Sequence, residues 1–190
     1  MRPIANTRSA AGIPTGRLAV WWVLASEIVI FGGVLASYLM HRLGNPDWAD
    51  QAAFTNVWIG AFNTFVLLTS SLSAVLAHYA AEHEQDGKKA AKLLGLTILG
   101  GGIFLCVKAF EWYTEISHGY TIQSHPFWSF YYTAAGIHAS HVIAGMILMA
   151  FVAKDAAKGQ ELHRVELVGI YWHFVDVVWI FLFPLLYIAK

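Results

Sequence analysis

The chain has 190 residues, of which 57% are hydrophobic and 13% charged, and its 12 Lys and Arg balance its 12 Asp and Glu. A soluble domain carries about 25% charged residues, so this composition disfavours a soluble single domain and a disordered chain. Without a basic excess, the chain has no general attraction for nucleic-acid phosphate. The lone Cys106 excludes an internal disulfide and a zinc site built on cysteines.

Five apolar stretches are each long enough to cross a bilayer, which takes about 20 residues. Because backbone polar groups in hydrocarbon must be satisfied within their own segment, we expect each stretch to be an α-helix. The polar breaks between them are short, so consecutive helices should run antiparallel in one bundle. The predicted fold class is therefore all-α, a polytopic membrane protein with a five-transmembrane-helix bundle. The predicted spans are residues 18–40, 54–81, 93–113, 127–152 and 167–189.

The first sixteen residues are expected to form a flexible or partner-dependent N-terminal tail, followed by a single membrane domain over residues 17–190. The first span is too long for the apolar core of a cleaved signal peptide and is interrupted by Glu27. We therefore interpret it as a retained helix.

Lysine and arginine are distributed unevenly about the spans. If five helices alternate in direction, nine of the twelve basic residues fall on one face. The positive-inside rule then places the N-terminus in the cytoplasm and the C-terminus on the outer or periplasmic side. The nine residues are Arg2, Arg8, Arg17, Lys88, Lys89, Lys92, Lys154, Lys158 and Arg164.

Glu27 is an ionisable side chain deep within a predicted span, where such groups are costly and mark candidate functional sites. It lies about 13 Å along the first helix at 1.5 Å per residue, and desolvation there disfavours a charged carboxyl. Two interpretations stay open: an element of a proton relay, or a protonated hydrogen-bond donor that holds helices together.

Two further pairs of polar residues lie at a similar depth in the fourth and fifth spans. His138 and His141 are i,i+3 neighbours, as are His173 and Asp176, so each pair shares a helix face. One interpretation is a zinc or iron site shared by two helices. The other is hydrogen bonding between helices. Packing of the spans would also bring Glu27 to the histidines of the fourth.

Two other pairs are candidates for contact with lipid or with another subunit. Lys108 and Glu111 form an i,i+3 pair near the outer end of the third span, which we interpret as a snorkelling lysine beside a neutralising acid. Trp172 and Trp179 lie seven residues apart on a similar face of the fifth span and would suit a partner surface.

The sequence contains no Gly-rich phosphate loop, nucleophile elbow or CxxCH haem-attachment motif. We assign no catalytic residue and no metal site to the chain. The residues by themselves favour an accessory membrane subunit or a small transporter.

The order of the polar residues resembles subunit III of the haem–copper oxidases. The matching stretches cover nearly the whole chain after residue 16, and the fifth is the most specific of them. They are WWVLASEIVIFGGVLASY, NTFVLLTSSLSAVLAHYA, LLGLTILGGGIFLCVKAFEWY, GIHASHVIAG and YWHFVDVVWIFLF.

The resemblance implies a subunit that carries no haem or copper of its own. It implies packing on the catalytic subunit I, with subunit II, a small subunit IV or a larger respiratory supercomplex as further partners. It also implies phospholipid bound between helices, support of sustained proton uptake, and a place in the bacterial cytoplasmic membrane. Glu27 falls on the family's carbodiimide-reactive carboxyl, and the polar groups of the other spans become structural or lipid-facing.

Two departures from the family pattern bear on this interpretation. Many members have seven helices, and this chain begins at what resembles the third, so the lipid cleft of the longer forms is in question. Lys108 stands where the family often has Gln. The alternatives left open are the equivalent subunit of a quinol oxidase or nitric oxide reductase, a stand-alone proton or solute transporter, and a metal-dependent membrane enzyme.

Overall fold

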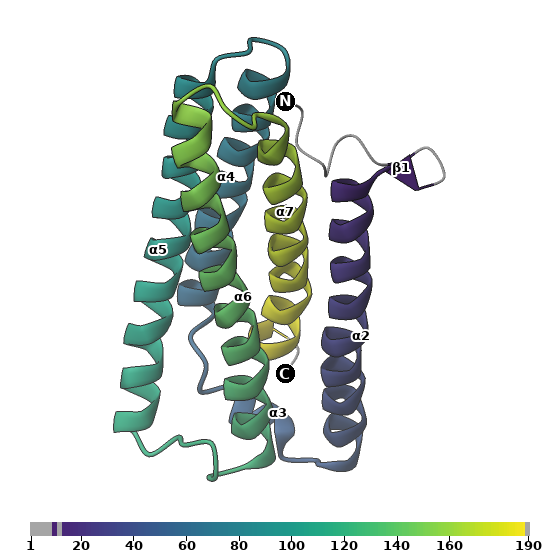
Figure 1. Cartoon of the computed structure of the whole chain (residues 1–190). Helices are drawn as coiled ribbons and strands as arrows, with labels where there is room; N and C mark the ends of the chain where they lie inside the picture. The colour runs from purple at the N-terminus through teal and green to yellow at the C-terminus, as the bar shows by residue number, and fades with distance from the viewer. Residues whose placement is uncertain (1–8, 11–12, 189–190) are drawn as a thin grey trace.

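The structure, a computed structural model, describes residues 9–10 and 13–188. Five helices in this part of the chain are long and apolar enough to cross a membrane, which confirms the predicted number of spans (Figure 1). Each contains most of its predicted span. α2, α5 and α6 extend beyond their spans at both ends, α4 begins later than predicted, and α7 begins earlier than predicted. They are α2 (Thr15–Gly44), α4 (Val57–Glu82), α5 (Gly87–Ser117), α6 (Pro126–Ala157) and α7 (His163–Phe183), the last continued by the π-helix η1 (Pro184–Ile188).

Polar side chains cap the helices at the ends of the polar breaks. The Asn56 carboxamide accepts hydrogen bonds from two backbone N–H groups at the start of α4, and the Asp86 carboxylate accepts one at the start of α5. Pro126 opens α6, where its missing N–H costs nothing. Three of the four breaks therefore end in a residue suited to begin the next helix, and the fourth ends in Leu162, which forms no side-chain cap.

Two short features were not predicted. The first break contains a five-residue helix, α3 (Trp48–Ala52), in which Trp48 is buried and donates its indole N–H to the Tyr38 hydroxyl, 3.1 Å away. Before α2, two-residue strands β1 (Ser9–Ala10) and β2 (Ile13–Pro14) pair antiparallel. The remainder of the expected tail lies outside the described residues.

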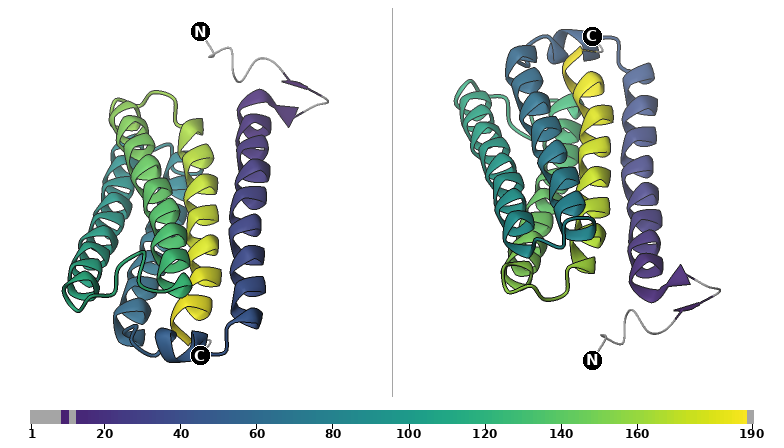
Figure 2. Two further views of the ribbon diagram at one scale, coloured as in Figure 1. Left: turned by 90° about the horizontal axis from the view of Figure 1, so that it is seen from below. Right: turned by 90° about the horizontal axis from the view of Figure 1, so that it is seen from above.

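Helices α4 to α7 form a four-helix bundle, and α2 lies along its α6–α7 side (Figures 1 and 2). Only Leu24, Phe31 and Tyr38 of α2 are buried, and their seven-residue spacing forms a single narrow seam. Most of the other apolar side chains of α2 are exposed. This helix therefore depends on few contacts for its position.

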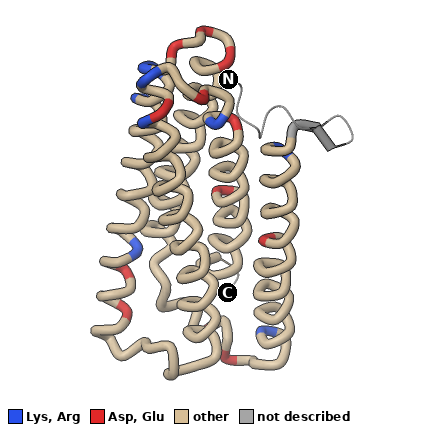
Figure 3. The backbone as a smooth tube through the Cα atoms, viewed as in Figure 1, with Lys and Arg blue, Asp and Glu red and all other residues tan. Residues whose placement is uncertain are grey.

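Charged side chains gather at one end of the bundle, where α2 begins and the α4–α5 and α6–α7 turns lie (Figure 3). We call this the N-terminal end. The opposite end, with α3, η1 and the loop between α5 and α6, is the C-terminal end (Figure 1). The distribution agrees with helices that alternate in direction.

Glycines allow α5 to approach its neighbours closely. A Cβ at Gly100 would lie 2.6 Å from the Ser70 Cβ of α4, and one at Gly101 would lie 2.8 Å from the Trp172 ring of α7. Gly95, on the same helix, has open space around it. The glycines at 100 and 101 thus set the helix spacing, as small residues do in membrane bundles.

We predict that Gly101→Val destabilises the bundle by about 1–3 kcal/mol, the usual cost of overpacking. The added side chain would meet the Trp172 ring and the Met146 side chain. Thermal unfolding of the purified protein measures the effect. The matched variant Gly95→Val should leave the melting temperature almost unchanged, and equal losses in both variants would contradict this account.

Candidate functional site: polar contacts inside the bundle

Glu27 of α2 and His141 of α6 meet across the seam between these helices. The Glu27 Oε2 atom lies 2.8 Å from His141 Nε2, and both side chains are largely buried, with 15% and 19% of their surface exposed. The Phe31 ring, one turn along α2, packs edge-on against the imidazole with 5.3 Å between ring centroids. The expectation that packing would bring Glu27 to the histidines of the fourth span thus agrees with this geometry.

The His141 ring lies between its own helix and Glu27. Its Nδ1 atom lies 2.8 Å from the Ile137 carbonyl oxygen. Its other ring nitrogen, Nε2, faces the Glu27 carboxyl as an ion pair by distance. Glu27 Oε2 has no hydrogen-bond partner among the described residues.

His138 does not join this pair. Its ring is fully buried and packs against Phe104 and Trp179, with centroids 5.5 Å and 5.2 Å away. Within the described part of the chain, no group of three or more His, Cys, Asp or Glu side chains converges in a way that could hold a metal ion. The zinc or iron interpretation of the histidines is therefore not supported by their arrangement.

His173 and Asp176 face α4 rather than α6. The His173 Nδ1 atom lies 2.6 Å from the Ser71 hydroxyl, and the buried Asp176 carboxyl lies beside the same hydroxyl. The His173 contact with Ser71 is of the kind expected for hydrogen bonding between helices. The two Asp176 carboxyl oxygens are buried and have no hydrogen-bond partner among the described residues.

Trp172 and Trp179 lie inside the bundle, not on its surface. Trp172 donates its indole N–H to the Ser70 hydroxyl at 3.1 Å, and Trp179 donates to the Thr64 hydroxyl at 3.0 Å. Both are at most 1% exposed. The expectation that they contact a partner or lipid does not fit this burial, because the indoles serve as large core residues whose one polar atom is satisfied by α4.

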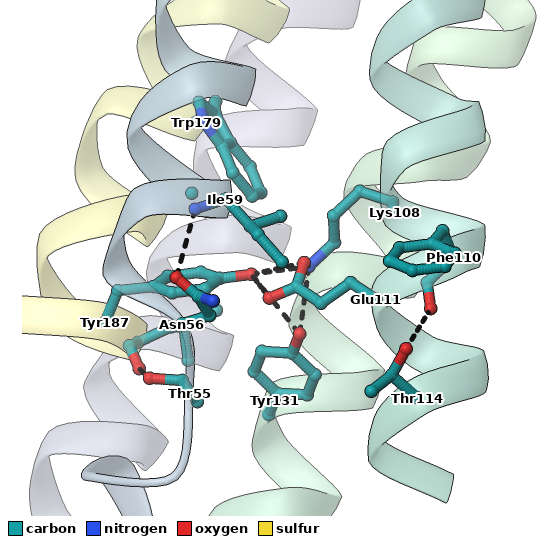
Figure 4. A network of polar contacts seen from close by, with 12 residues as sticks. Thr55, Asn56, Ile59, Lys108, Phe110, Glu111, Thr114, Tyr131, Trp179 and Tyr187 are labelled. Atoms are coloured by element: carbon teal, nitrogen blue, oxygen red, sulfur yellow. Dashed lines mark hydrogen bonds and ion pairs between the residues drawn. The ribbon is translucent and has the colours of Figure 1, made fainter. Parts of the chain in front are cut away.

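Lys108 is the centre of a buried polar cluster that joins α5, α6 and η1 (Figure 4). Its ammonium donates to Glu111 Oε2 at 3.0 Å, to the Tyr131 hydroxyl at 3.1 Å and to the Tyr187 hydroxyl at 2.7 Å. Tyr187 in turn donates to Glu111 Oε1 at 2.8 Å. All three ammonium hydrogens are used, so the cation is fully coordinated.

Aromatic rings complete the surroundings of the ammonium. It lies 4.7–5.7 Å from the centroids of four rings, a range that allows cation–π attraction. Lys108 and Glu111 are 2% and 1% exposed, so the interpretation of Lys108 as a snorkelling lysine is wrong, and neither residue is available to lipid or to another subunit. The four rings belong to Trp112, Tyr131, Trp179 and Tyr187.

The sequence did not connect Tyr131 or Tyr187 with Lys108, and Tyr187, which its place at a span end suggested for the membrane interface, is fully buried. They lie 23 and 79 residues from Lys108, and nothing in local spacing connects them. Pro184 offers a partial signal for Tyr187, because it has no N–H to continue an α-helix. The chain widens there into η1, and Tyr187 reaches the cluster from this turn.

We predict that Lys108→Met destabilises the protein by about 3–5 kcal/mol, because it leaves the Glu111 carboxylate buried without its cation. Thermal unfolding checks this. Adding Glu111→Gln should recover most of the loss, while Lys92→Met, on the exposed surface of the same helix, should have little effect. A double variant no more stable than Lys108→Met alone would contradict the ion-pair explanation.

Comparison with known proteins identifies the family. Residues 11–190 match the family model described as cytochrome c oxidase subunit III. The chain is 36% identical to cytochrome c oxidase subunit 3 of Corynebacterium diphtheriae over 174 residues, which are 88% of this chain and 84% of the relative. It is 35% identical to the Bacillus subtilis protein of the same name over 180 residues, which are 90% and 84% of the two chains.

A third relative carries the corresponding region within a larger protein. Heme-copper oxidase subunit I+III of Aeropyrum pernix is 32% identical over 185 residues, which are 91% of this chain and 22% of the relative. These matches do not favour the quinol oxidase, nitric oxide reductase or transporter alternatives. The chain belongs to the cytochrome c oxidase subunit III family and is an integral membrane subunit of a haem–copper oxidase, associated with subunit I.

Proposed function

We propose that this subunit stabilises subunit I of an aerobic cytochrome c oxidase and supports proton uptake during oxygen reduction, with Glu27 and His141 as the polar pair that carries this role. The observation behind the proposal is the 2.8 Å contact between these two largely buried ionisable side chains. A proton shared between them at this depth would let the pair exchange a proton without placing net charge in hydrocarbon. The haem and copper that reduce oxygen belong to the partner subunits.

The position of the pair supports an effect on a neighbouring subunit. α2 packs on the rest of the chain by one narrow seam, and the pair is a polar link within that seam. A change in the protonation of either residue would alter the polar contact that ties α2 to α6. Glu27 therefore acts as a positioning residue for α2 and as a modulator of proton delivery.

We also propose a phospholipid between α2, α6 and α7. A groove of about 490 Å³ lies there, lined mainly by apolar side chains such as Val20, Val23 and Leu148, with Arg164 at its edge. Acyl chains suit the apolar walls, and the guanidinium suits a phosphate. α2 forms one wall of this groove, so the groove does not need the additional helices of the seven-helix members.

The membrane is proposed to be the bacterial cytoplasmic membrane, with subunit II, a small subunit IV and a larger respiratory assembly as further partners. The gathering of Lys and Arg at the N-terminal end of the bundle supports a cytoplasmic N-terminus (Figure 3). Co-purification of a subunit II with a dinuclear copper domain would identify cytochrome c as the electron donor.

Glu27→Ala is predicted to leave the complex assembled, with normal haem and copper spectra and a normal initial rate. A polar contact between membrane helices, such as the one that it removes, is worth about 0.6–2 kcal/mol, too little to dissociate the bundle. We expect the variant to lose activity faster than the wild type during continuous turnover, measured as oxygen consumption over time.

Ser26→Ala provides the matched control, because this exposed neighbour bonds only to the Val23 carbonyl of its own helix. It should behave as wild type. Loss of haem or copper spectra in Glu27→Ala, with the subunit still present, would refute an accessory role. Identical activity decay in all three proteins would refute a role for the pair.

The orientation predicts opposite labelling of the two ends of the bundle in intact cells. With Cys106 replaced by Ser, a cysteine at Asn45 should react with a membrane-impermeant maleimide added outside. A cysteine at Lys89 should react only after the cells are opened. The reverse pattern would invert the topology.

A further inference from the structure

A pocket of about 460 Å³ opens at the C-terminal end of the bundle, beside the Lys108 cluster. The start of α4, the end of α5 and the loop after α5 enclose it. Two carboxylic acids lie in its wall, surrounded by aromatic side chains. The lining residues are Phe54, Asn56, Ile59, Phe110, Glu111, Thr114, Glu115, His118 and Tyr120.

We propose that this pocket binds the side chain of a lysine or arginine that belongs to another polypeptide of the oxidase complex. The proposal is independent of the role of Glu27 and rests on a carboxyl group, that of Glu115, with which none of the described Lys or Arg residues forms an ion pair.

The charges around the pocket do not balance. Lys108 directs its three hydrogens to Glu111 and two tyrosine hydroxyls, so the cluster consumes its only cation. Glu115 follows Glu111 by one helical turn and is only 7% exposed. Among the described residues, no Lys or Arg forms an ion pair with Glu115, and no side chain is seen to hydrogen-bond to it.

The position of the His118 ring does not make it the counter-ion of Glu115. Its Nδ1 atom lies 2.8 Å from the Thr114 carbonyl oxygen, so the ring is held against its own helix. The electrostatic neighbours of the Glu115 carboxyl are His118, Lys108 and the like-charged Glu111. A nearly buried acid beside another acid calls for a cation from outside the chain.

The aromatic walls suit an organic cation. Phe54 and Tyr120 stack with 4.9 Å between their centroids and form one side of the pocket. Phe110, 65% exposed, stands at the surface of α5. Rings beside carboxylates hold the alkyl stem and the charged head of Lys or Arg together, as the rings around Lys108 already do within this chain.

Other cations fit the pocket less well. The described residues contain no group of three or more metal-ligating side chains, which disfavours a metal ion. Among the described residues that line the pocket, none is Lys or Arg, so the phosphate of an ethanolamine lipid would have no basic partner there. Glu115 lies two residues before the end of α5, within reach of a loop or helix end of a neighbouring subunit.

Photo-crosslinking in the assembled oxidase identifies the occupant directly. With benzoylphenylalanine in place of Phe110, we expect a crosslinked peptide from another subunit that contains a Lys or Arg. The same probe in place of Tyr79, an exposed aromatic at the N-terminal end, should not give that peptide. Crosslinks to lipid alone, or none to protein, would overturn the proposal.

Removal of the charge tests the energetics in the same complex. For Glu115→Gln we expect the dissociation constant of this subunit from the complex to rise by about thirtyfold or more, the effect of removing one partner of a buried charge pair. The control Asp50→Asn neutralises an exposed acid at the same end of the bundle and should change it little.

Charge exchange separates a direct contact from a folding defect. Glu115→Lys should weaken binding further, and replacing the crosslinked basic residue of the partner with Glu should restore it. If Lys190→Gln reproduced the effect of Glu115→Gln, the occupant would be this chain's own C-terminus and the proposal would be wrong. These readouts measure assembly, so they fail or succeed separately from the turnover test of Glu27.

Discussion

Several polar side chains inside this bundle find their hydrogen-bond partners on another helix. The indoles of Trp172 and Trp179 donate to serine and threonine hydroxyls of α4, and Ser73 of α4 contacts Thr97 of α5 at 2.7 Å. An unsatisfied polar group in hydrocarbon costs several kcal/mol. These hydrogen bonds therefore fix how each helix is rotated about its axis, which apolar packing alone leaves weakly determined.

The same constraint explains the unequal attachment of the helices. The four helices α4 to α7 share large buried aromatics and close glycine contacts. α2 is attached by one seam and by polar contacts that include the pair of Glu27 and His141, the Arg17–Glu166 ion pair and the hydrogen bond from the Tyr38 hydroxyl to the Leu185 carbonyl. A proton shared by Glu27 and His141 would link helix position to protonation. Such a link is what an accessory subunit needs if it is to influence proton uptake without a redox centre.

The Lys108 cluster shows how a full charge is kept in the core. Three hydrogen bonds and four aromatic rings replace its hydration, and Pro184 allows η1 to bring Tyr187 into place. Replacing a buried ion pair by apolar residues is often neutral for stability. The cluster is better understood as setting the position of η1, and it leaves the adjacent acid Glu115 for a partner.

Hydropathy and charge in the sequence determined the five helices and their alternating direction, because the ability to cross a membrane is a property of each segment by itself. They also identified the polar residues that lie within the spans. Motif order also indicated the family. Only the tertiary structure decided which polar groups meet: His141 but not His138 joins Glu27, and Tyr131 and Tyr187 surround Lys108. These pairings depend on helix rotation and on contacts between residues far apart in the chain, which local spacing does not encode.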